Sequence, residues 1–182
     1  MLNTLPMAKP SGFTLIEMMI VVAIIVLATT LGLPSYRTWV QNTQIYNAAE
    51  SAQNGLQKAQ AEAVKLNSNV EFVLAANSPW KIQLAGSAVI ESSTMEGSKN
   101  VTHTATPTNA TTITFNNLGG VGVPPNTPFN TDGSAPLRQI EFDSAVLTGS
   151  RKLRVTIGIN GVGSNIRMCD PNLATGTSPR AC

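Results

Sequence analysis

The chain has 182 residues, a length typical of one domain, with 12% charged residues and a formal net charge of +2. Thr, Asn, Ser and Gly fill the places where a cytosolic surface carries Lys and Glu, which favours an exported protein. The small net charge argues against bulk electrostatic binding to nucleic acid, although the part from Arg138 onward is mildly basic. The composition predicts a helical stalk and one globular head with a modest core.

The first element is a run of mostly apolar residues from Phe13 to Leu33. Its roughly 21 residues, at about 1.5 Å of rise each, are enough to cross a hydrocarbon core of about 30 Å. No small-x-small cleavage site follows the run, as a secretory signal needs, so an uncleaved anchor fits better. We therefore predict a transmembrane segment over about 13–33. Tyr36 and Trp39 follow it, either as interfacial aromatics or as core residues of an assembly.

Glu17 interrupts this apolar run. An ionised carboxylate there costs roughly 2.5–3.5 kcal/mol on insertion scales, so it needs a partner. The next cation along the chain is Arg37, about five helical turns away, which places the partner outside this helix. In the alternative interpretation, Glu17 is protonated or lies near the interface of an ordinary anchor.

Residues 9–17, Lys-Pro-Ser-Gly-Phe-Thr-Leu-Ile-Glu, resemble the prepilin cleavage and methylation motif of type IV pilins and type II secretion pseudopilins. The resemblance implies that a prepilin peptidase cuts after Gly12, removes residues 1–12 as a leader and N-methylates Phe13. It also implies that Glu17 meets the N-terminal amine of a neighbouring subunit. A carboxylate and an ammonium buried together attract strongly, whereas either one alone is penalised.

Pro34 follows the apolar run and removes one backbone donor, so we expect a break or bend in the helix there. Beyond it, small and apolar residues recur at three- and four-residue steps, which predicts an amphipathic stripe that docks on the head. The stripe comprises Ile45, Ala48, Ala49, Ala52, Leu56, Ala59, Ala63 and Leu66. One helix is thus predicted over 13–66.

After Asn67 the sequence breaks into short alternating runs separated by Gly, Pro, Asn and Ser, which is typical of an antiparallel β domain. The candidate strands are 70–74, 80–84, 111–115, 139–142, 153–159 and 162–168. The last two flank Asn160-Gly161, a type I′ turn signal, and form the best hairpin. Residues 119–136 are rich in Gly, Pro, Asn and Thr and are expected to form an exposed loop. The predicted fold class is α+β, with a long N-terminal helix packed on an antiparallel β-sheet head over 67–182.

Cys169 and Cys182 are the only two cysteines. A disulfide in an oxidising compartment is the economical interpretation, and closing a loop of roughly a dozen residues contributes about 3 kcal/mol. Two free thiols in a reducing compartment are the alternative. The order of helix, β head and cysteine-bounded tail resembles the GspH/FimT/FimU class of minor pilins and pseudopilins. The tail, residues 166–171 and 179–182, is similar to that of FimU and FimT, and secretion pseudopilins of this class generally lack it.

This resemblance implies a structural role as a minor pilin that sits in, or primes, a type IV pilus. The chain would be anchored once in the bacterial inner membrane, with its head in the periplasm. Its implied partners are other pilin or pseudopilin subunits, prepilin peptidase and the inner-membrane assembly machinery. The alternative machine is the pseudopilus of a type II secretion system.

A third role is DNA binding in natural transformation, because some FimT-like proteins carry Gly-Arg-x-Arg just before the first cysteine. The matching residues 164–167 keep only the second arginine, Arg167. The basic residues of this part of the chain either form a phosphate-contacting patch or lie on a solvated strand face. The candidate residues of the patch are Arg151, Lys152, Arg154, Arg167 and Arg180.

His103 is the only histidine and lies in a Thr-rich stretch that we expect to be exposed. No nucleophile, metal-ligand cluster or phosphate-binding glycine loop accompanies it. We therefore predict neither an enzyme nor a metal site, and no cofactor is implied.

Overall fold

The computed structural model describes residues 12–75, 79–94, 97–121, 130–159, 164–176 and 178–182. The chain divides into two compact units, Met1–Arg37 and Thr38–Cys182. The predicted helix is confirmed as α1 (Leu15–Leu66). Pro34 lies inside α1, so the predicted break is wrong: the helix continues because the ladder bonds on either side survive the loss of one donor. A bend at Pro34 stays a prediction.

The first unit contains the apolar half of α1. Every residue from Phe13 to Leu33 is exposed in this structure. An 18-residue window of α1 has a mean hydropathy of 2.5, and none of it is buried. By length and composition, α1 is the one helix in the described part of the chain that can span a membrane.

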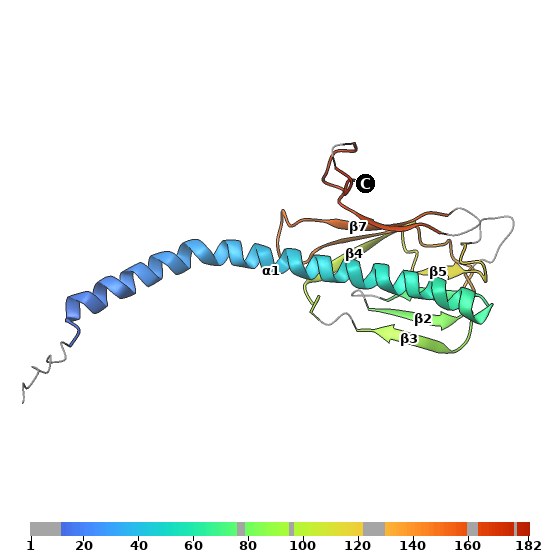
Figure 1. Cartoon of the computed structure of the whole chain (residues 1–182), viewed down its shortest axis with the longest axis horizontal. Coiled ribbons are helices and arrows are strands. Elements are labelled where there is room, and N and C mark those ends of the chain that lie inside the picture. The colour runs from blue at the N-terminus through green and yellow to red at the C-terminus, as the bar shows by residue number, and fades with distance from the viewer. Residues whose placement is uncertain (1–11, 76–78, 95–96, 122–129, 160–163, 177) are drawn as a thin grey trace, which may run out of the picture. The chain divides into compact units, whose positions relative to one another are not determined.

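Among its described residues, the head contains two four-stranded antiparallel sheets, with the strand orders β3-β2-β1-β5 and β4-β6-β7-β8 (Figure 1). The first consists of β1 (Val70–Leu74), β2 (Trp80–Leu84), β3 (Val89–Ser93) and β5 (Thr112–Phe115). The second consists of β4 (Val101–Thr106), β6 (Gln139–Ser144), β7 (Leu153–Ile157) and β8 (Ile166–Cys169). Only β3 and β4 were not predicted. The β7–β8 pairing is confirmed, whereas the predicted Asn160-Gly161 turn lies outside the described residues.

The second half of α1 forms one side of a core shared with both sheets, and Figure 1 shows it alongside their strands. Its buried residues follow the predicted stripe, with Gln41 and Gly55 in addition. Leu66 was expected in the stripe but is 42% exposed, because α1 ends there. Gly55 allows the sheet to approach closely: a Cβ at this position would lie 2.8 Å from Cε2 of Trp80 and 3.0 Å from Cε2 of Phe72.

The segment 119–136, predicted to be an exposed loop, is partly buried. Among its described residues, Val121 is 1% exposed and Asn130 is 3% exposed. Asn130 donates from Nδ2 to the carbonyl oxygen of Thr112 at 2.9 Å, and its Oδ1 accepts from Thr114 Oγ1 at 2.9 Å. The polar side chain of Asn130 is buried because these partners replace the hydrogen bonds that water would make.

Glu71 joins the same segment to the first sheet. Its Oε1 accepts from the backbone N and Oγ1 of Thr131 at 2.8 and 2.7 Å, and its Oε2 accepts from Gln83 Nε2 at 2.9 Å. Burial raises the pKa of this carboxyl group, but the hydrogen bonds from Gln83, Thr131 and Gly86 outweigh burial, so the pKa lies below its ordinary value. The ionised form of Glu71 therefore holds Thr131 in place.

Candidate assembly site

Thr14 and Glu17 form a reciprocal cap at the N-terminus of α1. Glu17 Oε2 accepts from the backbone N and the Oγ1 of Thr14, both at 2.8 Å. Thr14 Oγ1 accepts in turn from the backbone N of Glu17 at 3.3 Å. This is the capping box, in which two otherwise unsatisfied backbone donors gain acceptors. The Thr-x-x-Glu spacing is the sequence signal for this cap. We had expected a partner for Glu17 only outside its own helix.

The capping box holds the Glu17 carboxylate among exposed apolar side chains. Phe13 precedes the box and is exposed, and exposed apolar residues flank Glu17 on both sides. They include Leu15, Ile16, Met18, Met19 and Ile20. Apolar surface of this extent on a protein marks an interaction with lipid or with another protein. The site can therefore bind one cation in apolar surroundings. This is non-covalent binding and not a chemical reaction.

The C-terminal tail is closed on β8. Cys169 ends β8 and is bonded to Cys182 with the Cα atoms 5.1 Å apart, which confirms the predicted disulfide. The backbone N of Asp170 donates to the carbonyl oxygen of Arg180 at 2.7 Å, and Asp170 forms a parallel bridge with Ala181. The Arg167 guanidinium also donates to the carbonyl oxygen of Ala181. The last residues of the tail therefore lie beside Asp170, directly after β8, and run parallel to it.

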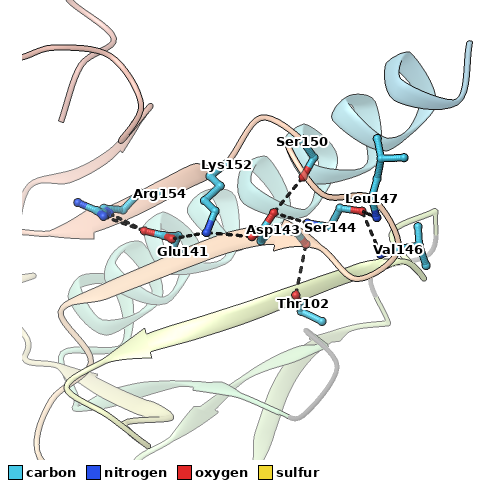
Figure 2. A network of polar contacts seen from close by, with 9 residues as sticks. All are labelled: Thr102, Glu141, Asp143, Ser144, Val146, Leu147, Ser150, Lys152 and Arg154. Carbon is cyan, nitrogen blue, oxygen red and sulfur yellow. Dashed lines mark hydrogen bonds and ion pairs between the residues drawn. The ribbon is translucent and has the colours of Figure 1, made fainter. Parts of the chain in front are cut away.

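Two of the five cations proposed to contact phosphate pair with carboxylates of the second sheet (Figure 2). Lys152 Nζ lies 2.9 Å from Asp143 Oδ2 and 3.5 Å from Glu141 Oε1. Arg154 Nη2 lies 2.7 Å from Glu141 Oε2. The hydrogen bond to Asp143 and the charges of both carboxylates raise the pKa of Lys152. These two cations therefore present little uncompensated charge to a phosphate.

The other three cations lie around the tail. Arg151 Nε is 2.7 Å from Oδ2 of the buried Asp170, and Arg167 is bonded to the tail as described above. Arg180 lies within the disulfide-closed loop and is exposed. The five cations thus belong to separate arrangements, which favours the solvated strand face over a continuous phosphate-contacting patch.

His103 lies in a stretch whose threonines, Thr102, Thr104 and Thr106, are exposed as expected, but its own side chain is less exposed than theirs. It is half-buried on β4, which pairs with β6, and its ring centroid is 6.5 Å from that of Phe142. Burial lowers the pKa of His103. Within the described ranges, no group of three or more His, Cys, Asp or Glu side chains is placed to hold a metal ion.

A helix with an exposed apolar first half, capped by a carboxylate and packed through its second half on antiparallel sheets, defines a pilin-like subunit. The chain belongs to the family described as type II transport protein GspH, whose model matches residues 48–163, more than half of the sequence. A second model, the prokaryotic N-terminal methylation motif, matches residues 7–33. The chain is therefore a membrane-anchored, pilin-like protein of the minor pilin and pseudopilin class, a class of structural proteins that assemble with other subunits.

Two solved structures of the type IV minor pilin FimU from Pseudomonas aeruginosa (strain PAO1) are similar to this chain. One crystal form is 19% identical, covers 79% of this chain and 98% of that one, and has a TM-score of 0.46. A second form is 20% identical, covers 74% of this chain and 97% of that one, and has a TM-score of 0.44. A search of curated proteins found no match.

Proposed function

We propose that this protein is a minor pilin, a subunit that sits in or primes a type IV pilus and assembles through α1. The supporting observation is the lone carboxylate of Glu17 at the capped N-terminus of an otherwise apolar, exposed segment. Such a segment serves equally as a membrane anchor before assembly and as a packing helix afterwards. Glu17 adds a charged group that needs a partner in apolar surroundings, which a purely apolar anchor does not need.

In this proposal a prepilin peptidase cuts after Gly12 and N-methylates Phe13. The chain is then anchored in the bacterial inner membrane with its head in the periplasm. The inner-membrane assembly machinery incorporates it into the pilus from there. Glu17 meets the N-terminal amine of a neighbouring subunit, and the two opposite charges relieve each other in low dielectric. The pair sets the register at which one helix enters beside another.

The disulfide-closed tail supports a pilus over a secretion pseudopilus. Cys169 and Cys182 close a tail that is similar in sequence to those of FimU and FimT. A disulfide also suits a head that works in an oxidising compartment. The pseudopilus of a type II secretion system is the second candidate, because its subunits carry the same N-terminal motif.

The proposal is tested in the source bacterium with the full-length chain carrying a C-terminal tag. Wild-type protein is expected in pili sheared from the cells. Glu17→Ala should remain in the membrane fraction but fall at least about tenfold in the sheared pili, because the assembling segment then lacks its one charged contact. Glu50→Ala, which removes an exposed carboxylate from the second half of α1, should leave both pools unchanged. Absence of the wild-type chain from pili, together with loss of protein secretion on deletion, would favour the pseudopilus.

A further inference from the structure

A pocket of about 210 Å³ opens beside the C-terminal tail. Tyr46 of α1 lines it, together with Arg151, which precedes β7, and Arg180 from the tail. Leu153 and Met168 add apolar lining from β7 and β8. The pocket thus brings two guanidinium groups and a phenol together with an apolar surface.

The charges in the pocket do not balance. Asp170 also lines it, with a side chain only 5% exposed, and its Oδ2 accepts from Arg151 Nε at 2.7 Å. Its Oδ1 accepts from the backbone N of Asn172 at 2.9 Å, so both oxygens have donors within the head. In the part of the chain that the structure describes, no carboxylate forms an ion pair with Arg180. Two guanidinium groups against one carboxylate leave a net positive charge.

The tail fixes the backbone of Arg180 at the pocket. The disulfide closes the loop around it, and its carbonyl oxygen accepts from the backbone N of Asp170 at 2.7 Å. Its own backbone N donates to Ser178 Oγ at 3.2 Å. The Asp170 carboxylate holds the guanidinium of Arg151. Less ordering of Arg151 and of the Arg180 backbone is then needed when an anion binds, which favours binding.

We propose that this pocket binds a single carboxylate side chain, an Asp or Glu of a neighbouring pilin-like subunit. The partner class rests on the proposed function, whereas the carboxylate follows from the chemistry of the pocket. Arg presents a planar fork of N–H donors that matches a carboxylate, and the Tyr46 hydroxyl adds a donor. Leu153 and Met168 provide apolar surface for the methylene groups of the incoming side chain.

The geometry fits a carboxylate better than the phosphates of DNA. Binding to a duplex recruits several cations along an open surface, and each phosphate contact adds to the salt dependence. Lys152 and Arg154, the cations that would extend such a surface, are paired with Asp143 and Glu141 (Figure 2). A small, partly apolar pocket accepts one anion instead. We therefore take DNA as an outcome of the test rather than as the proposed ligand.

The test measures association of the full-length chain with co-produced subunits that carry the N-terminal methylation motif, in detergent-solubilised membranes. Arg180→Glu should weaken the association at least about tenfold, and Arg180→Gln should weaken it less. Arg138→Glu makes the same charge change at another exposed arginine of the head and should have no effect. A single Asp→Lys or Glu→Lys change in one partner subunit should restore association with Arg180→Glu and weaken association with the wild type.

The proposal is overturned if Arg180→Glu associates normally, if Arg138→Glu weakens association equally, or if no charge exchange in a partner restores it. Normal association combined with loss of salt-dependent binding to a DNA duplex would assign the pocket to nucleic acid. Retention of the Cys169–Cys182 disulfide, checked by mass, shows that a variant has kept its tail. The association measurement does not depend on whether the subunit serves a pilus or a secretion system. Absence of the chain from pili would refute the minor-pilin role, and the charge exchange would still show whether the pocket binds a carboxylate.

Discussion

Replacing Gly55 with Ala should destabilise the head, although the same change stabilises most helices. In an open helix interior, Gly→Ala contributes about 1 kcal/mol of stability. Here the added Cβ would lie 2.8 and 2.9 Å from Cε2 and Cζ2 of Trp80, closer than real Cβ atoms approach. Trp80 is nearly buried and cannot yield freely, because its ring packs 5.7 Å from that of Phe72 and its Nε1 donates to Ser51 Oγ at 3.1 Å.

The size of the effect follows from these contacts. Overpacking a core costs about 1–3 kcal/mol. Weakening the hydrogen bond to Ser51 adds about 1 kcal/mol. After the gain in helix propensity is subtracted, Gly55→Ala should lower the free energy of unfolding by about 2 kcal/mol, or the Tm by roughly 6 °C for a head of this size.

Urea unfolding of the full-length chain in detergent, followed by far-ultraviolet circular dichroism, measures this difference. Trp80→Phe removes the two nearest indole atoms but leaves the contact with Phe72 Cε2 at 3.0 Å, so in that background Gly55→Ala should cost less than about 1 kcal/mol. Gln57→Ala, on the exposed side of α1, should change stability by less than about 0.5 kcal/mol. Stabilisation by Gly55→Ala alone, or the same effect in both backgrounds, would refute the close packing of α1 on β2.

Two further predictions concern the sheet and the tail. Glu71→Gln should lower stability by about 2 kcal/mol at neutral pH, because an amide cannot accept all the hydrogen bonds that the carboxylate receives. The pKa of Glu71 is lowered in the folded chain, so its contribution is present above its ordinary pKa and is lost as the pH falls through the folded value; denaturation curves of the two proteins should therefore converge in acid. Cys182→Ser should lower stability by about 3 kcal/mol and speed hydrogen exchange at the amide of Asp170, which is bonded to Arg180; unchanged exchange would mean that the disulfide does not hold the tail.

Local patterns in the sequence were enough to predict α1 and six of the strands. The stripe of small residues in α1 repeats with the period of a helix, and β1 and β2 have the predicted bounds. By contrast, β3 reads Val-Ile-Glu-Ser-Ser and lacks alternation, and half of β4 is Thr, with few large apolar side chains. Both are strands because they pair with β2 and β6, which are contacts that no local pattern specifies. The division into two sheets depends on the same pairings.

The candidate site was predictable only where its chemistry is local. Glu17 and the cysteines stand out by type and position in the sequence. The cations of the tail and second sheet stand out equally, but their partners come from other strands: Glu141 lies opposite Arg154 in the β6–β7 register. Counting charges along the sequence therefore overestimates the cationic surface. Packing also made Gly55 and Gln41 part of the buried face, although neither is apolar enough to join a predicted stripe.

Processing of the N-terminus is the step on which the minor-pilin role depends most, and the intact mass of the protein recovered from membranes measures it. Cells with and without prepilin peptidase would be compared. We expect loss of residues 1–12 together with the gain of one methyl group, only where the peptidase is present, since cleavage after Gly12 would expose Phe13 as the new N-terminus. A full-length mass in both samples would mean that the leader is not removed, and the protein would then be an ordinary single-pass anchor carrying a β-rich head.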